Sequence, residues 1–173
     1  MSIFINSLKK GLVTVDSACF KALDTSAAEN AGKELEKLIR KQFARSFHIR
    51  EVDTGSCGGC ESEIISATNP IYDLQRFGVD FVASPRHADA LLVTGPVSKN
   101  MELALKKTFE AMPGPKVVIT LGDCAGNGGL FADSYYTLGG VKSVLPVTLH
   151  IPGCPPKPVE IIAALLRFLK NSK

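Results

Sequence analysis

The chain has 173 residues, of which 45% are hydrophobic and 21% charged, and its formal net charge is +3. This length and apolar content predict one domain with a sizeable buried core. The charge is too mild, and Lys and Arg are too scattered among acids, to favour a nucleic-acid partner. Because the mean hydropathy is +0.14 and Trp is absent, we expect part of the surface to be buried against other proteins.

The sequence predicts neither a membrane-spanning helix nor a secretory signal. No apolar run approaches the ~20 residues that a spanning helix needs, and the tract near Ile161 to Leu169 is interrupted by Arg167. The N-terminus lacks a small-residue cleavage site after its apolar cluster. We therefore predict a reducing, cytosolic location, in which the five cysteines are ligands or free thiols rather than disulfides.

Residues 1–45 form an N-terminal extension that differs from the rest of the chain. Residues 28–45 place apolar side chains at helical spacing, which predicts an amphipathic helix. We expect this helix to pack on the domain or on a neighbouring subunit; a membrane-surface helix is less favoured because its polar face mixes Glu with Lys. For residues 2–15, the sequence does not distinguish a flexible arm from a second short amphipathic segment. Cys19 is predicted to be a free, buried thiol.

From Phe47 onward, short apolar runs alternate with helical stretches. The predicted strands are Phe47–Val52, Val79–Ala83, Ala90–Thr94, Lys116–Thr120 and Val147–Ile151, and the predicted helices are Cys60–Arg76, Asn100–Ala111 and Pro158–Lys170. Short strands separated by helices of ten or more residues are typical of a parallel sheet. The sequence therefore predicts a doubly wound α/β domain over residues 46–173, with helices on both faces of the sheet.

Four of the cysteines follow predicted strands. Cys57 and Cys60, in TGSCGGCESEI, follow the first strand, Cys124 in GDCAG follows the fourth, and Cys154 in PGCPPKP follows the fifth. The carboxyl ends of parallel strands meet at one edge of the sheet, where open α/β folds build their sites. We therefore expect these four thiols to converge on one place.

The loops around these cysteines are rich in Gly and Pro, which favours a buried anionic group. Glycine lets backbone N–H groups approach a sulfur closely, and proline stiffens the loop. Four thiolates match a 4Fe-4S or a 2Fe-2S cluster, and spacing does not choose between these two. A structural zinc site is less favoured, because such sites usually use two CxxC pairs, whereas Cys124 and Cys154 are 30 residues apart. A redox dithiol would use only Cys57 and Cys60 and would leave the other two cysteines unexplained. A further alternative is that the four cysteines form no common site.

Four segments together resemble a known family. In chain order they are TGSCGGCESEI, ASPRHADALLVTGPVSKNM, LGDCAGNGGLF and IPGCPPKPVEII. They are similar to the small subunit of energy-converting nickel-iron hydrogenases, such as those of formate hydrogenlyase and of membrane-bound archaeal hydrogenases, and to the cluster-bearing subunit of respiratory complex I. The resemblance covers roughly residues 46–170. The complex I subunit typically begins its ligand set with adjacent cysteines, so the spacing of Cys57 and Cys60 favours a hydrogenase.

The resemblance implies a flavodoxin-like fold with one 4Fe-4S cluster bound by Cys57, Cys60, Cys124 and Cys154. It implies an electron-transfer role inside an oxidoreductase complex, with no catalysis by the chain alone. The expected partners are a nickel-iron large subunit that reduces protons to hydrogen, a ferredoxin-like iron-sulfur subunit and membrane subunits. The chain would be a peripheral subunit on the cytoplasmic side of the cell membrane. The alternatives are a related quinone, sulfur or polysulfide reductase and, from another class, a zinc-binding structural module.

Two further pairs of residues are candidates for an interface or a proton path. Glu61 and Glu63 follow the second cysteine at a predicted helix start, where carboxylates are favoured by the helix dipole alone. Arg86 and His87 lie in the segment that, in complex I relatives, is near the quinone pocket. Arg86 has the alternative of a structural ion pair with Asp89. Separately, His150 is predicted to be a core residue with a hydrogen-bond partner.

Overall fold

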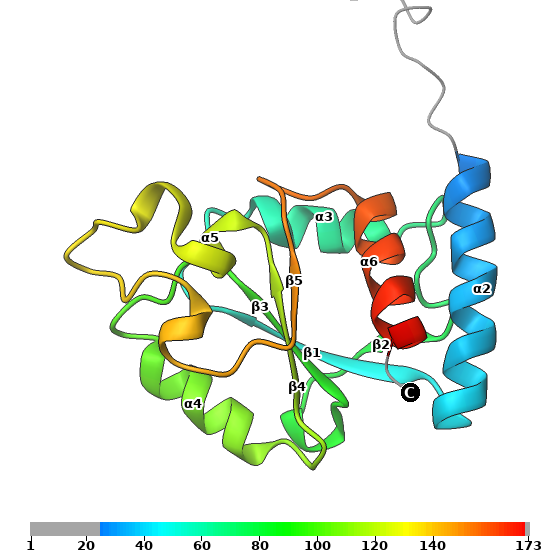
Figure 1. Ribbon diagram of the computed structural model, residues 1–173, viewed down its shortest axis with the longest axis horizontal. Coiled ribbons are helices and arrows are strands. Elements are labelled where there is room, and N and C mark those ends of the chain that lie inside the picture. Colours follow the sequence, from blue (N-terminus) through cyan, green and yellow to red (C-terminus); the bar gives the residue numbers. More distant parts are fainter. Residues whose placement is uncertain (1–24, 172–173) are drawn as a thin grey trace, which may run out of the picture.

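The computed structural model describes residues 25–171, which form five strands and five α-helices (Figure 1). The strands are β1 (Phe47–Asp53), β2 (Val79–Phe81), β3 (Ala90–Thr94), β4 (Val117–Leu121) and β5 (Leu149–Ile151). The helices are α2 (Thr25–Phe43), α3 (Gly59–Ala67), α4 (Glu102–Ala111), α5 (Asp123–Asn127) and α6 (Pro158–Asn171), with 3₁₀ turns η2 (Pro85–His87), η3 (Gly129–Phe131) and η4 (Val141–Ser143).

The five strands form one parallel sheet in the order β2-β1-β3-β4-β5. This is the flavodoxin-like doubly wound order, in which the chain reverses its direction of winding between β1 and β3. The central strand β3 is buried at all five residues, which explains its uninterrupted apolar sequence. The predicted fold class is confirmed.

Helices cover both faces of the sheet and divide the core in two. Helices α2, α3 and α6 lie on one face, and α4 and α5 on the other (Figure 1). Alternate residues of β3 serve the two cores: Ala90 and Leu92 face the first group of helices, whereas Leu91 and Val93 face the second. Each helix therefore buries its apolar stripe against a different set of strand side chains.

The helix of the N-terminal extension packs on the domain itself. Leu35 and Ile39 of α2 are buried in the same core as α6. The Gln42 side-chain amide donates to the Leu169 carbonyl at 2.9 Å, and Lys170 forms an ion pair with Glu34 at 2.7 Å. One of the two expected packing modes is thus confirmed, while the division of the chain at residue 46 stays a prediction. Residues 2–15 and Cys19 lie outside the described residues.

The helix predicted over Cys60–Arg76 is wrong in its second half, since α3 ends at Ala67. Pro70 disfavours a helical conformation at Asn69. The Asn69 side chain instead accepts a hydrogen bond from the backbone N–H of Ile71 at 2.9 Å, which makes a turn. The segment that follows α3 leads through this turn to β2 without further α-helix.

The remaining differences concern the ends of elements and short turns. Strands β2 and β5 are each two residues shorter than predicted, β4 is shifted by one residue, and α4 begins at Glu102 rather than Asn100. Helix α5 and the 3₁₀ turns were not predicted, because single turns leave no periodic pattern in the sequence. The strand pattern was right because β-branched and aliphatic residues dominate these runs.

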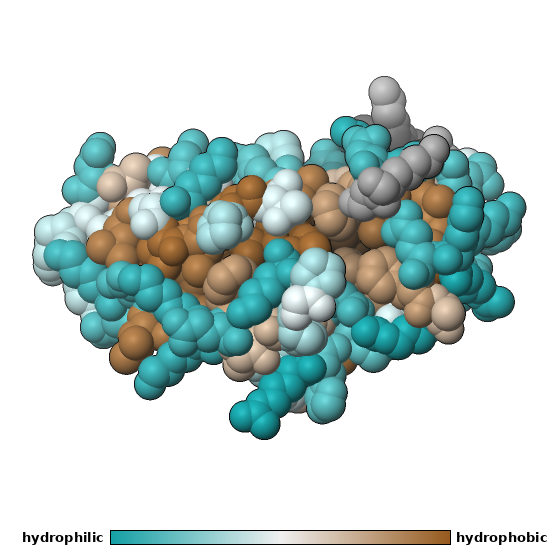
Figure 2. Space-filling view, turned by 60° about the horizontal axis from the view of Figure 1, so that its bottom comes forward, coloured by the Kyte–Doolittle hydropathy of each residue, from teal (hydrophilic) through white to brown (hydrophobic). Residues whose placement is uncertain are grey.

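The surface of the molecule is not uniformly polar. Figure 2 shows a continuous apolar band across one face, bordered by hydrophilic side chains. Seven large hydrophobic side chains in the described part of the chain are exposed, and four of them lie between residues 130 and 136. None of the helices between residues 25 and 171 has the length and apolarity that crossing a bilayer requires.

We predict that Leu35→Ala lowers the free energy of unfolding by about 2–5 kcal/mol, because it opens a cavity between α2 and α6. The exposed Lys37 on the same helix supplies the control: Lys37→Ala should change stability by no more than about 0.5 kcal/mol. Urea unfolding of the full chain measures both. An unchanged midpoint for Leu35→Ala would mean that α2 does not stabilise this domain.

Candidate functional site

The four cysteines that follow strands all lie at the carboxyl edge of the sheet. Cys57 and Cys60 follow β1, at the point where the sheet's winding reverses, and Cys60 lies in the first turn of α3. Cys124 lies in α5 directly after β4, and Cys154 follows β5. Open α/β folds bind ligands at this position, outside the carboxyl ends of the strands.

One cavity of about 120 Å³ is lined by all four cysteines. Its other lining residues are Ser56, Gly59, Gly95, Asp123, Gly153 and Pro155. Cys57 and Cys154 are exposed and Cys60 and Cys124 are half-buried, so the cavity opens to the surface on one side. The structure brings the four thiols together as their loops predicted. That they bind a cluster stays a prediction.

The loop after β1 is held by its own side chains. The carboxylate of Asp53 accepts hydrogen bonds from the backbone N–H groups of Gly55 and Ser56, both at 2.7 Å. The buried Thr54 hydroxyl donates to the Thr94 carbonyl at 2.8 Å, which ties this loop to the end of β3. Gly58 then adopts φ of +84° and turns the chain into α3. Local hydrogen bonds thus set the position of Cys57.

The loops after β4 and β5 are joined to each other through Asp123. The Asp123 backbone N–H donates to the Gly153 carbonyl at 2.9 Å, and the Asp123 carboxylate accepts from the Gly153 N–H at 3.0 Å. The Gly122 N–H also donates to the Ile151 carbonyl at 2.8 Å. These three bonds hold Cys124 and Cys154 on facing loops, although they are far apart in the sequence.

Two glycines come close enough to the sulfurs that any side chain would collide with them. A Cβ on Gly122 would lie 2.7 Å from the Cys60 sulfur, and one on Gly129 would lie 2.7 Å from the Cys124 sulfur. Gly122 has φ of +86°, which other residues rarely adopt. The thiols are therefore packed directly against backbone, which can offer N–H groups to a negatively charged sulfur.

The thiols influence one another's protonation. Burial, followed by the negative charge of Glu61 and the nearby thiols, raises the pKa of Cys60 to about 12. The pKa of Cys124 is also raised, mainly by burial and then by Cys154 and Cys57, while a hydrogen bond from the Leu130 backbone N–H lowers it. Cys60 and Cys124 therefore favour the neutral thiol, and a cation that needs their thiolates must displace protons.

The four cysteines are a ligand set that fits an iron-sulfur cluster. Four thiolates on one zinc ion would each lie ~2.3 Å from a single point, whereas these four thiols surround a cavity. Among residues 25–171, no group of three or more His, Cys, Asp or Glu side chains is placed to hold one metal ion. Cysteine thiolates are the usual ligands of both 2Fe-2S and 4Fe-4S clusters, and amides near the sulfurs stabilise the cluster's charge.

Glu61 and Glu63 lie in the first half of α3, beside the cavity rather than in its lining. Both carboxylate oxygens of Glu61 are buried and have no hydrogen-bond partner. The half-buried Glu51 of β1 has a raised pKa because of its burial and then the charge of Glu61. Whether Glu61 or Glu63 serves a proton path stays a prediction.

Arg86 and His87 lie at the amino ends of the strands, opposite the carboxyl ends where the cysteines lie. Both are exposed residues of η2, which precedes β3. The ion pair considered between Arg86 and Asp89 is not observed; Asp89 is held instead by two hydrogen bonds from Arg45, at 2.7 and 2.9 Å. The structure thus separates this pair from the thiols, and an interface role for it stays a prediction.

His150 is not a core residue as predicted, because it is exposed at the end of the sheet. The expected hydrogen-bond partner is present: its Nδ1 lies 2.9 Å from the Thr120 hydroxyl. The short strand β5 is paired on one side only, with β4, which leaves its residues partly open to solvent. The apolar run that predicted burial therefore lies at the edge of the sheet.

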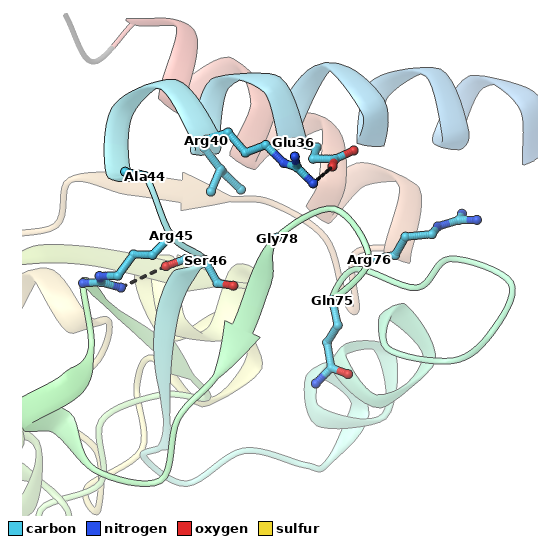
Figure 3. Close-up of a pocket in the computed structure, with 9 residues that line it drawn as sticks. Glu36, Arg40, Ala44, Arg45, Ser46, Gln75, Arg76 and Gly78 are labelled. Atoms are coloured by element: carbon cyan, nitrogen blue, oxygen red, sulfur yellow. Dashed lines mark hydrogen bonds and ion pairs between the residues drawn. The ribbon is translucent and has the colours of Figure 1, made fainter.

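A larger pocket of about 500 Å³ lies between α2 and the segment before β2 (Figure 3). Its lining includes Arg40, Arg45 and Arg76, but Figure 3 shows these side chains pointing in different directions. Arg40 is paired with Glu36 at 2.7 Å, and Arg45 donates to the Ser46 carbonyl at 2.9 Å. The three guanidinium groups do not converge on one ligand, and the pocket contains no cysteine.

A family model described as NADH ubiquinone oxidoreductase, 20 Kd subunit, matches residues 57–168. The match begins at the first cysteine of the cavity, extends past the last one and includes more than half of the chain. The chain belongs to this family. The matched region includes all four cysteines of the cavity, while α2 and β1 lie before it.

Two relatives of this chain are a hydrogenase subunit and a formate hydrogenlyase subunit. It is 44% identical over 142 residues to the probable membrane-bound hydrogenase subunit mbhJ of Pyrococcus furiosus, covering 80% of this chain and 85% of that protein. It is also 44% identical over 124 residues to formate hydrogenlyase subunit 7 of Escherichia coli K12, covering 72% of this chain and 49% of that protein. The chain therefore matches about half the length of the second relative.

Two solved structures share the fold of this chain. A chain of the membrane-bound sulfane sulfur reductase, an archaeal respiratory membrane complex, superposes with a TM-score of 0.63 at 27% identity, covering 87% of this chain and 78% of that chain. A chain of an NAD⁺-reducing [NiFe]-hydrogenase superposes with a TM-score of 0.57 at 20% identity, covering 75% and 94%. At 20% identity, the similarity to the hydrogenase chain supports only the shared fold.

Several residues that shape the site were not singled out from the sequence. Asp53 and Asp123 organise the cysteine loops, and the backbone of Leu130 reaches the Cys124 sulfur. The signal for Asp53 was present, since Asp followed by Thr-Gly-Ser is typical of a side-chain-capped turn. The role of Asp123 had no such signal, because its partner Gly153 lies 30 residues away.

We predict that Cys60 is the slowest of the four site thiols to react with iodoacetamide in cluster-free protein at pH 8. With a pKa of about 12 rather than 9.0, it carries roughly a thousandfold less thiolate than an ordinary thiol, and the thiolate is the nucleophile. Mass spectrometry of each labelled peptide measures the four rates. The same reaction in guanidinium should remove the difference; equal rates in the folded protein would contradict the burial of Cys60.

We predict that Gly122→Ala lowers the iron retained per chain at least twofold, because the new Cβ would press on the Cys60 sulfur. Gly139→Ala is the matched control: Gly139 also has a positive φ, of +80°, but its Cβ would meet open space. Iron analysis after anaerobic purification compares the two variants. Equal iron loss in both would attribute the effect to backbone strain rather than to the sulfur.

Proposed function

We propose that this chain is the electron-transfer small subunit of a membrane-bound nickel-iron hydrogenase. The observation that carries the proposal is the single cavity lined by Cys57, Cys60, Cys124 and Cys154, in a chain whose relatives include hydrogenase subunits. The four thiols would hold one 4Fe-4S cluster. When bound, such a cluster accepts and passes on one electron at a time.

The chain's own residues hold the four sulfurs and control their surroundings. Gly122 and Gly129 let backbone approach the Cys60 and Cys124 sulfurs, and the Leu130 N–H favours the charged form of the Cys124 sulfur. The bonds between Asp123 and Gly153 keep the last two loops in place. Fixed loops and partly excluded water are the means by which a protein tunes a cluster's potential.

The chain would work only as part of a complex. The proposed partners are a large subunit with the nickel-iron centre, a ferredoxin-like iron-sulfur subunit that delivers electrons, and membrane subunits. Exposed apolar side chains and the apolar band of Figure 2 support burial against other proteins. We propose a peripheral position on the cytoplasmic side of the membrane, with proton reduction to hydrogen occurring in the large subunit.

A second function keeps the cluster and changes the reaction. The likeness to a chain of the sulfane sulfur reductase complex, at 27% identity, favours a sulfur or polysulfide reductase as this alternative, and the family description favours a quinone reductase. The zinc-binding structural module is less well supported, because the four thiols line a cavity rather than close on one point.

We predict that the complex purified anaerobically through this chain contains about four irons per copy of the chain, with nickel in a larger subunit. Metal analysis and electron paramagnetic resonance after reduction test this. Cys124→Ser should weaken or abolish the cluster signal and lower turnover. Cys19→Ser is the matched control, because it replaces the cysteine that lies outside the proposed ligand set and should leave the signal unchanged.

Each other outcome of this experiment has a definite meaning. Iron without nickel would support the sulfur- or quinone-reducing alternative in place of the hydrogenase. Zinc in place of iron would contradict both. An unchanged signal in Cys124→Ser would contradict the assignment of the four ligands.

A further inference from the structure

Asp123 places a carboxylate in the wall of the cysteine cavity. Apart from the four cysteines, the described residues that line this cavity are Asp123, one serine, one proline and three glycines. Asp123 is thus the lining residue that brings a fixed charge to the sulfurs, and its side chain is half-buried. A carboxylate beside thiolates disfavours their negative charge. Two effects of this side chain can be separated, namely a hydrogen bond and a charge.

The hydrogen bond joins the two loops that carry Cys124 and Cys154. The Gly153 N–H donates to the Asp123 carboxylate at 3.0 Å, and the Asp123 N–H donates to the Gly153 carbonyl at 2.9 Å. Asp123 directly precedes Cys124 in the chain, and Gly153 directly precedes Cys154. Two bonds in opposite directions between these neighbours therefore fix the spacing of the two cysteines.

The backbone of Gly153 is constrained in the conformation that makes these bonds. Gly153 has φ of +138°, and a Cβ at this position would lie 2.7 Å from the Cα of Pro156. The loop after β5 is therefore packed closely on itself. Its N–H and carbonyl groups are presented to Asp123 by a segment with little room to shift.

The hydrogen bond alone does not require an aspartate. The side-chain carbonyl oxygen of an asparagine would occupy nearly the same position and would accept from the same Gly153 N–H. What an aspartate adds to this bond is a negative charge. The identity of residue 123 therefore decides the charge of the cavity wall and not only the shape of the loops.

The charge of Asp123 acts on the sulfur of Cys124. Burial is the main cause of the raised pKa of Cys124, Cys154 and Cys57 follow, and the charge of Asp123 raises it further. Adding an electron to a cluster held by Cys124 also increases the negative charge at this place. A carboxylate that opposes the thiolate therefore opposes that electron as well.

We propose that Asp123 is a positioning residue with two separable effects on the site: its hydrogen bond to Gly153 retains the cluster, and its charge lowers the cluster's reduction potential. The inference rests on the proposed function, because only a bound cluster has a potential. The step concerned is the addition of one electron from the donor subunit, with no bond or proton exchanged at Asp123. A cluster that is harder to reduce is a stronger electron donor once reduced, which suits the reduction of protons.

Two variants of the full chain, purified anaerobically with its cluster, separate the bond from the charge. Asp123→Asn keeps the bond and removes the charge. At the wild-type midpoint potential, its ratio of reduced to oxidised cluster should rise at least threefold, while iron release to a chelator stays within twofold of wild type. Asp123→Glu keeps the charge, but its extra methylene displaces the carboxylate from Gly153. It should release iron at least fivefold faster, with a smaller change in the ratio than Asp123→Asn.

The matched control is Asp133→Asn, which removes a carboxylate from the same connection between α5 and β5. Asp133 is exposed and does not line the cavity, so solvent screens its charge. Its ratio and its iron release should equal those of wild type. Redox titration followed by electron paramagnetic resonance measures the ratio. The proposal is overturned by an unchanged ratio in Asp123→Asn, by an equal rise in Asp133→Asn, or by iron release from Asp123→Asn as fast as from Asp123→Glu.

The hydrogen bond can also be measured in the cluster-free chain. The amide of Gly153 should exchange with deuterium at least tenfold faster in Asp123→Ala than in wild type, and at the wild-type rate in Asp123→Asn. The amide of Gly55, which donates to Asp53 at 2.7 Å, is the internal reference and should not change. Equal exchange at Gly153 in Asp123→Ala and wild type overturns the positioning role.

Failure of the proposed function would be distinguishable from failure of this inference. Zinc in place of iron in the wild-type chain contradicts the proposed function and, with it, any effect on a potential. A wild-type cluster whose potential does not respond to Asp123→Asn overturns this inference alone and leaves the four-cysteine assignment intact.

Discussion

The parallel pairing of the strands is the constraint on which the cysteine site depends. Each helical connection returns the chain to the same starting edge, so every strand of the sheet ends on the same side. Residues as far apart in sequence as Cys57 and Cys154 can line one cavity only because of this arrangement. The two apolar cores, one on each face of the sheet, hold the strands in this register and so hold the loops that extend from it.

The cavity favours protonated thiols, whereas a bound metal requires thiolates. Burial raises the pKa of Cys60 and of Cys124, so these two thiols favour the protonated form. Thiolates become favourable only when positive charge is placed among them. The glycines at positions 122 and 129 make the close approach possible, and the hydrogen bonds of Asp123 keep the facing loops together. Under the proposed function, the iron of a bound cluster would supply this positive charge.

The two ends of the sheet have different tasks. At the amino ends of the strands, Arg45 and Asp89 connect the segment after α2 to the start of β3. These contacts are structural. At the carboxyl edge, half-open thiols lie next to an ordered loop with exposed tyrosines. Under the proposed function, exchange with partners would take place at the end of the strands opposite to these structural contacts.

The sequence by itself determined the fold class, the central strands and the side of the sheet on which the cysteines lie, because these follow from local apolar patterns and from strand direction. It placed β3 correctly and extended the helix after Cys60 too far, since the turn at Asn69 depends on a side chain bonding to the backbone beyond it. Only the tertiary structure decided which glycines touch sulfur, that Arg45 rather than Arg86 holds Asp89, and that His150 is exposed. These facts join residues that are distant in the chain, and their energies depend on packing that no local pattern records.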